Sequence, residues 1–360
     1  MTELKIDAFY MPAEYAPHCA TVMIWCERGG SWNYGAKPAR PVFASAIKEI
    51  CAGEKVYLAV SPTGRKSAEE YLSKEIAGGA VELLDIETDD CWARDIAPTF
   101  VTDGKRLRGI DWKFNAWGGE YNGLYDDYAN DDAFAAKLCE KLGVESFSAR
   151  PFVLEGGSIH SNGKGTVITT EECLLSKGRN PELNKAEIES KLKEYLGAKR
   201  VIWLPYGVVG DETDGHVDNI CAFADENTVL LGWTDIDGGQ KERCKANLLV
   251  LENAGIKVIK LPFPEKPVKF SQSDLDGFKY ADGEAERSLD EVLAASYVNF
   301  YISNAAVIVP QFGDKNDKVA LEIIKSAFKD RKTVGILATE IIKGGGNFHC
   351  LTQQIPLLRK

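Results

Sequence analysis

One pattern recurs five times along the 360-residue chain, and it limits the folds that the chain can adopt. Each unit is a short apolar strand, a polar turn rich in glycine or acidic residues, and a further apolar strand. A repeated unit of this kind buries its apolar faces against its neighbours, so the sequence predicts a closed, pseudo-symmetric α/β arrangement. The units begin at 81–86, 152–154, 201–204, 258–261 and 334–337, and segments with helical spacing lie at 131–143, 181–197, 241–255 and 317–331.

The chain is expected to form one domain over residues 1–360, because no Pro/Ser-rich linker or low-complexity tract divides it. Turns at 162–163 (Asn-Gly) and 225–227 predict hairpins in the second and third units. A doubly wound sheet is the alternative α/β fold. That fold would place a glycine-rich phosphate loop after the first strand, and this sequence has none there.

Charge and cysteine content narrow the functional classes. The net charge is −11, with 54 acidic and 43 basic residues and no Lys/Arg cluster, so we expect no nucleic-acid partner. An acidic protein is compatible with a cationic substrate. No run of 18 apolar residues exists, and residues 1–7 lack the apolar core of a signal peptide. Nine cysteines without a CxxC pair are typical of reduced thiols, so we expect a cytoplasmic protein without membrane association.

The polar turns hold most of the candidate catalytic residues. Asp95, Glu155 and His216 lie in three successive turns, 60 and 61 positions apart. In a radial repeat, equivalent turns converge on one axis. We therefore expect these three side chains to meet at one centre with Cys350, which lies in the last turn.

Cys350 is the candidate nucleophile. It follows three glycines, 344–346, whose entropic cost indicates a tight turn or a close approach of the backbone to a ligand. A cysteine nucleophile needs thiolate character and a partner acid or base. His216 is the favoured partner, because strand alternation would place it on one face with Asp218, whereas His349 would point away from Cys350 and have a structural role. An ordinary buried cysteine after a glycine turn is the alternative.

The carboxylates of the polar turns suggest two roles. Glu155 can orient a histidine and raise its basicity. Asp95 with a second carboxylate can bind a planar cation in bidentate fashion, and a guanidinium is such a cation. A metal site built from the same turns with His160 is a competing interpretation, although no HExxH, CxxC or DxDxDG spacing is present. A Cys-His protease is a third interpretation, but it would not need so many carboxylates at its centre.

Seven motifs follow one another along nearly the whole chain: 11–15 (MPAEY), 92–95 (WARD), 114–119 (FNAWGG), 154–158 (LEGGS), 170–175 (TEECLL), 211–218 (DETDGHVD) and 344–350 (GGGNFHC). Each motif alone is moderately specific, and in this order they are highly specific. On these motifs the sequence resembles the agmatine deiminases, within the porphyromonas-type peptidylarginine deiminase family of the guanidine-modifying (pentein) superfamily.

The resemblance implies a five-bladed pseudo-symmetric α/β propeller, the pentein fold, in agreement with the five units. It also implies hydrolysis of agmatine to N-carbamoylputrescine and ammonia, a step of polyamine biosynthesis, without metal or organic cofactor. A homo-oligomer, most simply a dimer, is expected because members of the family are often dimeric or larger.

The resemblance also implies a role for each residue of the site. Cys350 attacks the guanidinium carbon, while Asp95 and Asp218 hold the guanidinium nitrogens. His216 protonates the departing ammonia and then activates the water that hydrolyses a thiouronium intermediate. Glu155 binds His216 and sets its protonation.

Six further residues are predicted to bind the rest of the substrate. Three acids beside the histidine can attract an ammonium group. Two tryptophans can line the space for a four-carbon chain or make a cation–π contact, and a glycine brings the backbone to the site. Two rival hypotheses remain open: a deiminase of free or peptidyl arginine, and a non-catalytic module on the same fold, as in the translation initiation factor six proteins. The six residues are Asp211, Glu212, Asp214, Trp92, Trp117 and Gly345.

Overall fold

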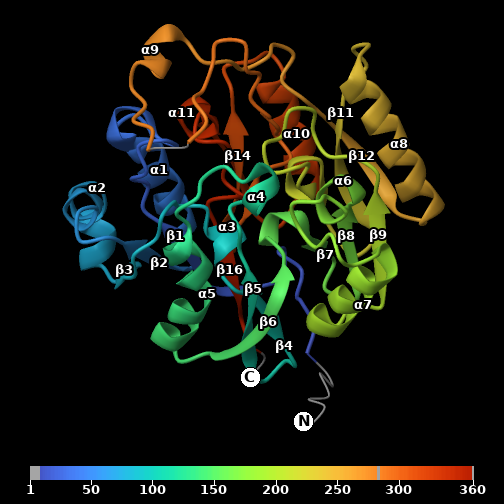
Figure 1. The fold of residues 1–360 in the computed structure, drawn as a ribbon, viewed down its shortest axis with the longest axis horizontal. Coiled ribbons are helices and arrows are strands. Elements are labelled where there is room, and N and C mark those ends of the chain that lie inside the picture. Colours follow the sequence, from blue (N-terminus) through green and yellow to red (C-terminus); the bar gives the residue numbers. More distant parts are fainter. Residues whose placement is uncertain (1–8, 282–283, 359–360) are drawn as a thin grey trace.

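The computed structural model describes residues 9–281 and 284–358 of the chain. Five small β-sheets, each a blade, are arranged in a ring (Figure 1). Helices such as α2 (Arg65–Ala77), α7 (Lys185–Leu196) and α8 (Gly239–Asn253) lie at the periphery. Large apolar side chains fill the space between sheets and helices. The five sheets confirm the predicted five-bladed α/β propeller.

Four blades follow one plan. The first two strands pair antiparallel and the last two pair parallel, so the chain crosses over before it enters the third strand. Both predicted hairpins are confirmed as the antiparallel pairs β7–β8 and β10–β11. The four blades are β4 (Thr99–Thr102), β5 (Leu107–Lys113) and β6 (Glu145–Val153); β7 (His160–Ser161), β8 (Thr166–Thr170) and β9 (Arg200–Leu204); β10 (Cys221–Phe223), β11 (Thr228–Trp233) and β12 (Lys257–Pro262); β13 (Tyr301–Ile302), β14 (Ala306–Gln311) and β15 (Lys332–Leu337).

The remaining blade joins the two ends of the described chain. β16 (Gln353–Pro356) pairs antiparallel with β1 (His18–Ile24), which is followed in the sheet by β2 (Lys55–Val60) and β3 (Val81–Asp85) in parallel. The last strand therefore completes the sheet that the first strand begins, and this pairing closes the ring.

The repeat units suggested by the sequence straddle two blades. The strand before each polar turn is the last strand of one blade, and the strand after it is the first strand of the next. For example, β3 leads through the turn that contains Asp95 to β4, which belongs to another sheet. The sequence pattern thus detected the five crossings between blades, because these crossings hold the conspicuous polar residues.

The four predicted helical segments are all helical, with somewhat different ends. α7 begins later than predicted because Asn184 and Glu187 form a capping box, and it ends at Gly197 in the left-handed conformation. The crossover helices α1 and α2 of the first blade were not predicted. Within the described ranges, no helix combines the length and the apolar character needed to cross a membrane. The helices are α1 (Arg40–Ile50), α2 (Arg65–Ala77), α3 (Ala93–Ile96), α4 (Gly119–Asn122), α5 (Ala129–Leu142), α6 (Glu171–Leu174), α7 (Lys185–Leu196), α8 (Gly239–Asn253), α9 (Gln272–Leu275), α10 (Asp317–Ala327) and α11 (Thr339–Ile342), with short 3-10 turns η1 (Asn33–Ala36), η2 (Gly156–Ser158) and η3 (Val217–Asn219).

Candidate active site

Each of the five crossings between blades brings a polar side chain to the centre of the ring. Each of these residues lies two to five positions before the first strand of the next blade, and all five side chains are buried. Equivalent places in a radial repeat face one axis, which is why residues far apart in sequence form one site. In chain order the five are Asp95, Glu155, Asp218, Asn299 and Cys350.

The Cys350 thiol is buried against two polar groups. Its sulfur lies 3.1 Å from Asn299 Nδ2 and 3.4 Å from an oxygen of Asp218. Burial raises the pKa of the thiol well above its ordinary value, and the charges of Asp218 and Asp95 raise it further. The thiol is therefore neutral at neutral pH, and a cation beside the sulfur would favour the thiolate.

His216 lies between two carboxylates. Its Nδ1 is 3.8 Å from an oxygen of Asp95, and its Nε2 is 3.7 Å from an oxygen of Glu155. Burial opposes the charged ring, but Asp95, the nearby Cys173 and Glu155 together raise the pKa of His216 well above its ordinary value. The ring is thus an imidazolium that can donate a proton.

A buried cation balances the charge of Glu155. Arg179 Nε donates to a Glu155 oxygen at 3.1 Å, and the same guanidinium donates to the Thr213 carbonyl and to Asp214. Burial opposes ionisation, yet the charges of Arg179 and His216 lower the pKa of Glu155 to about 2. Glu155 therefore remains ionised and stabilises the imidazolium beside it.

Asp95 accepts two hydrogen bonds, from Trp117 Nε1 at 2.9 Å and from the Gly157 N–H at 2.8 Å. Burial raises the pKa of Asp95 to about 6; the charge of His216 opposes this rise, and neighbouring carboxylates add to it. Gly157 has to be small, because a Cβ there would lie 2.6 Å from His216 Nδ1 and 2.8 Å from Asp95. A guanidinium beside Asp95 and Asp218 would offset the repulsion between them.

Asp218 is ionised and has one oxygen available. Its Oδ2 contacts His349 Nδ1 at 2.8 Å, while its Oδ1 has no hydrogen-bond partner in the described part of the chain. Burial opposes ionisation, but the hydrogen bond and the charge of His349 lower the pKa of Asp218. The strand geometry expected for His349 and Cys350 was wrong: residues 348–351 form a turn, so both side chains reach Asp218.

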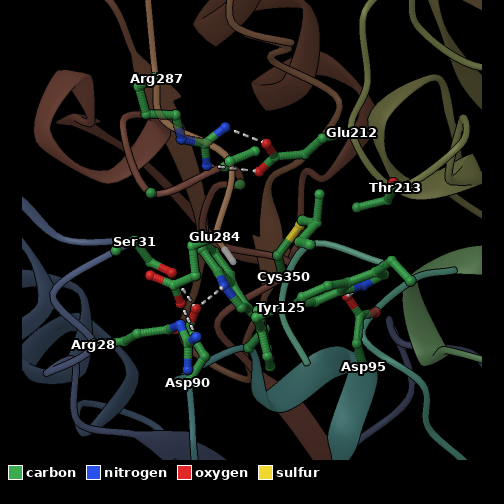
Figure 2. A pocket seen from close by; sticks show the side chains of 18 of the residues that line it. Arg28, Ser31, Asp90, Asp95, Tyr125, Glu212, Thr213, Glu284, Arg287 and Cys350 are labelled. Carbon is green, nitrogen blue, oxygen red and sulfur yellow. Dashed lines mark hydrogen bonds and ion pairs between the residues drawn. The ribbon is translucent and has the colours of Figure 1, made fainter. Parts of the chain in front are cut away.

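A narrow cavity of about 70 Å³ lies beside Cys350. Its walls include aromatic rings and two ion pairs on opposite sides, Arg287 with Glu212 and Arg28 with Glu284 (Figure 2). Arg287 Nη2 lies 3.2 Å from a Glu212 oxygen, and Arg287 Nη1 bonds the other oxygen, so this pair is bidentate. Aromatic walls with charges near the mouth suit a thin aliphatic chain that carries a cation at each end.

The six predicted substrate-binding residues divide into two sets. Asp211 accepts hydrogen bonds from Thr213 and Asn219 within its own loop. Asp214 pairs with Arg179 at 3.0 Å. These two aspartates do not line the cavity, and their carboxylates already have partners. The other four do line it: Trp92, Trp117, Glu212 and Gly345.

Asn299 was missed by the sequence argument. Its side-chain oxygen accepts from the backbone N–H groups of His349 and Cys350, and its amide donates to Asn219 at 2.9 Å. These bonds hold the turn that carries Cys350. A signal was present, because Asn299 precedes the first strand of its blade as Asp218 and Cys350 precede theirs, but the long insertion before it concealed the equivalence.

Known proteins resemble this chain over almost its full length. Residues 10–356 match the family model described as Porphyromonas-type peptidyl-arginine deiminase. A provisionally named agmatine deiminase of Selenomonas ruminantium is 52% identical over 99% of this chain and 98% of its own. The agmatine deiminase of Ectopseudomonas mendocina (strain ymp) is 44% identical over 99% of this chain and 97% of its own. The solved agmatine deiminase of Enterococcus faecalis has a TM-score of 0.93 at 39% identity, covering 99% of this chain and 98% of that one.

Proposed function

We infer that this chain, which belongs to the Porphyromonas-type peptidyl-arginine deiminase family, is a hydrolase that converts agmatine and water into N-carbamoylputrescine and ammonia in putrescine synthesis. The observation that carries this inference is the arrangement around Cys350: a buried thiol, two aspartates and a histidine held between two carboxylates, next to a narrow cavity. A guanidinium carbon is resonance-stabilised, so attack on it needs this combination of positioning, charge matching and proton supply.

Binding is the first event, and it activates the nucleophile. Asp95 and Asp218 hold the guanidinium, and the available Oδ1 of Asp218 gives it an acceptor. The positive charge beside Cys350 makes the neutral thiol more acidic, so its proton leaves to solvent as the substrate settles. In this scheme Cys350 becomes a thiolate when its target is in place.

The covalent step then releases ammonia. The Cys350 sulfur forms a bond to the guanidinium carbon, and the bond from that carbon to an unsubstituted nitrogen breaks. His216 gives its proton to this nitrogen, so neutral ammonia departs and a cationic thiouronium group remains on the sulfur. Glu155, kept ionised by Arg179, favours the protonated form of His216 from which this step starts.

Water completes the reaction. Neutral His216 now takes a proton from a water molecule, whose oxygen attacks the thiouronium carbon. The carbon–sulfur bond breaks, the thiolate leaves, and loss of a proton from the product gives the neutral carbamoyl group. The same residue thus serves as acid and then as base.

The charges at the cavity favour agmatine over arginine. Arg28 and Arg287 could receive a substrate carboxylate, but each is already paired, with Glu284 and with Glu212. A third acid, Asp90, also lines the cavity. Because these acids surround the cavity, we expect kcat/KM for agmatine to exceed that for free arginine by about 100-fold or more.

The test is a comparison of the wild type with Cys350→Ala and Cys19→Ala. Cys19 is an exposed cysteine outside the site and serves as the matched control. We expect ammonia release from agmatine by the wild type and the Cys19 variant, and none by the Cys350 variant. A haloacetamidine should label Cys350, as judged by peptide mass spectrometry. Normal turnover by Cys350→Ala, or preferential turnover of arginine or a peptide with C-terminal arginine, would contradict the proposal.

We further propose that residues 1–360 act as one catalytic domain, in a cytoplasmic homodimer. The closure of the ring by β16 supports a single domain, and the nine free thiols support a cytoplasmic location. Light scattering at the concentration of the activity assay measures the oligomeric state.

A further inference from the structure

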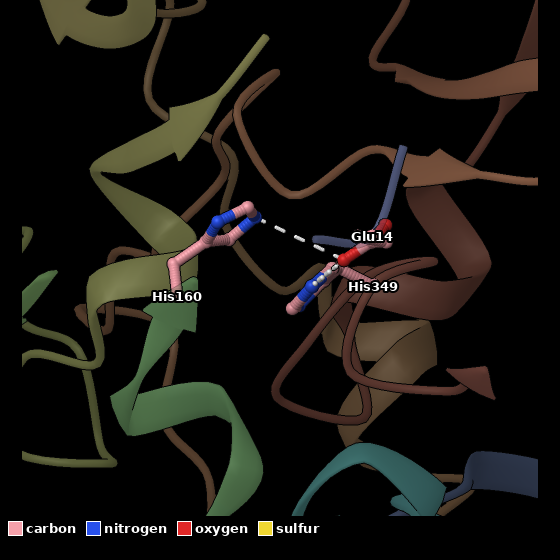
Figure 3. Close-up of side chains that lie close together, drawn as sticks. All are labelled: Glu14, His160 and His349. Carbon is pink, nitrogen blue, oxygen red and sulfur yellow. Dashed lines mark hydrogen bonds and ion pairs between the residues drawn. The ribbon is translucent and has the colours of Figure 1, made fainter. Parts of the chain in front are cut away.

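A buried chain of charged groups extends from Asp218 to the N-terminal segment. His349 contacts Asp218 Oδ2 through Nδ1 at 2.8 Å and Glu14 Oε2 through Nε2 at 2.7 Å. Figure 3 shows Glu14 and His349 facing each other, with His160 farther off. None of Glu14, His349 and Asp218 is more than 4% exposed. The sequence neighbour of the nucleophile thus joins a carboxylate of the active site to one outside it.

The contacts determine the protonation of His349. A carboxylate oxygen faces each ring nitrogen, so both nitrogens have to donate, and only an imidazolium has two N–H groups. Burial and the charge of Arg94 oppose this form, but Glu14 and Asp218 raise the pKa of His349. His160, which burial keeps neutral with a pKa of about 4, is the other titratable group beside it.

Glu14 is itself held in place. Its Oε1 accepts the Ile302 N–H at 3.0 Å, and the Arg94 guanidinium lies 3.6 Å from its Oε2. Glu14, His160 and His349 also lie close enough together to hold a metal ion. The adjacent guanidinium of Arg94 and the use of both His349 nitrogens by carboxylates argue against a metal ion there, and favour an anchor for the imidazolium.

We propose that His349 is a positioning residue of the deiminase reaction: anchored by Glu14, its imidazolium keeps Asp218 ionised and oriented, so that Oδ1 is left for the guanidinium. This inference rests on the proposed function. Oδ2 of Asp218 is held by His349 and lies 3.4 Å from Cys350 Sγ. Loss of the imidazolium would therefore disturb both substrate binding and the contact with the nucleophile.

The test uses His349→Gln, with Glu14→Gln as a second variant and His160→Gln as the matched control. His160 is equally buried and stacks on His349 at 5.9 Å, but within the described residues no hydrogen bond or ion pair joins it to Asp218. We expect kcat/KM for agmatine to fall by about 10- to 100-fold in His349→Gln, because the charged hydrogen bond to Asp218 is lost. The fall should be smaller in Glu14→Gln, which keeps the histidine and loses only its anchor. The acid limb of the pH profile, which Asp95 sets in the wild type, should move to higher pH, since Asp218 loses the partner that keeps it ionised and both aspartates then have to lose a proton.

A labelling ratio separates positioning from general damage to the fold. Chloroacetamidine carries the planar cation that Asp218 binds, whereas iodoacetamide is neutral, and both alkylate Cys350. We expect the ratio of the two inactivation rates to fall by about tenfold in His349→Gln, with the iodoacetamide rate little changed. In His160→Gln the ratio should match the wild type.

Two results would overturn the inference. The first is folded His349→Gln with an unchanged ratio of inactivation rates and an unchanged acid limb. The second is a loss of kcat/KM in His160→Gln equal to that in His349→Gln. If His349→Gln does not fold, Glu14→Gln gives the same readouts with the histidine retained. Failure of the wild type to release ammonia from agmatine would instead overturn the proposed function, while the labelling ratio would still report on Asp218.

Discussion

Asp95 has to be ionised to bind a guanidinium, yet burial brings its pKa to about 6. Below that pH the protonated form predominates, and a neutral carboxyl group binds a cation weakly. Substrate binding favours the ionised form, so agmatine should displace a proton from Asp95 in weakly acidic solution. Burial of Asp95 close to Asp218 therefore costs free energy, and the substrate cation would offset this cost when it binds.

This linkage predicts the pH dependence of the reaction. We expect kcat/KM to fall roughly tenfold per pH unit as the pH decreases below about 6, because the free enzyme loses the ionised Asp95. Initial rates at low agmatine concentration across the acidic range measure this limb. A profile that stays flat well below pH 6 in enzyme that remains folded would show that Asp95 is not the group responsible.

The residue types in the polar turns were predictable, and their partners were not. Cys350, His216 and the three carboxylates stand in recognisable motifs. Arg179 is marked by no motif of its own in the sequence argument, although its guanidinium keeps Glu155 ionised. Its effect depends on a contact between the segment that joins α6 to α7 and the crossing that carries Glu155, and the sequence pattern does not reveal such a contact.

The crossing from β6 to β7 is short and tightly packed, so its glycines matter as much as its acid. Gly157, in η2, donates to Asp95 and lies against His216 and Asp218. The space that a side chain would need is already occupied by the side chains of His216, Asp95 and Asp218. The crossing from β6 to β7 therefore contributes in two ways: it supplies Glu155 to the site, and at Gly157 it leaves room for the side chains around that glycine.

Gly157→Ala tests this packing. We expect kcat/KM to fall by about 100-fold or more, because the added methyl group displaces His216 or Asp95 from its position. Gly239→Ala is the matched control: a Cβ there meets only Val209, at 3.8 Å, and activity should be retained. Circular dichroism checks that both variants fold. Full activity in folded Gly157→Ala would mean that the backbone around residue 157 can shift to accommodate the methyl group without displacing His216 or Asp95.

Pairing of β16 with β1 connects the two ends of the described chain and also places the active site. Cys350 lies three residues before β16, so the strand that completes the first blade also fixes the turn that carries this candidate nucleophile. The Gln353 and Gln354 side chains in β16 accept hydrogen bonds from Arg94, which stands next to Asp95. Ring closure and assembly of the site therefore depend on the same strand.

Truncation of the chain before Gln353 should abolish both ring closure and assembly of the site. We expect the shortened protein to lose cooperative thermal unfolding and to aggregate, because β1 would become an uncovered edge strand. A chain that ends after Leu357 retains β16 and should behave as the full-length protein does. Thermal unfolding monitored by circular dichroism, together with light scattering, compares the two. A folded, monodisperse protein without β16 would show that the other four blades suffice.

The sequence alone predicted the number of blades, the four main crossover helices and the candidate site residues, because these predictions depend on hydrophobic periodicity and on the residue types of local turns and motifs. Three features were decided only by the tertiary structure: the pairing of Arg179 with Glu155, the place of Asn299 under the nucleophile, and the bridge from Glu14 through His349 to Asp218. Each joins segments that lie far apart along the chain, and the protonation of the buried groups follows from those contacts. A residue's neighbours in sequence do not set the field around a buried charge, whereas its neighbours in space do.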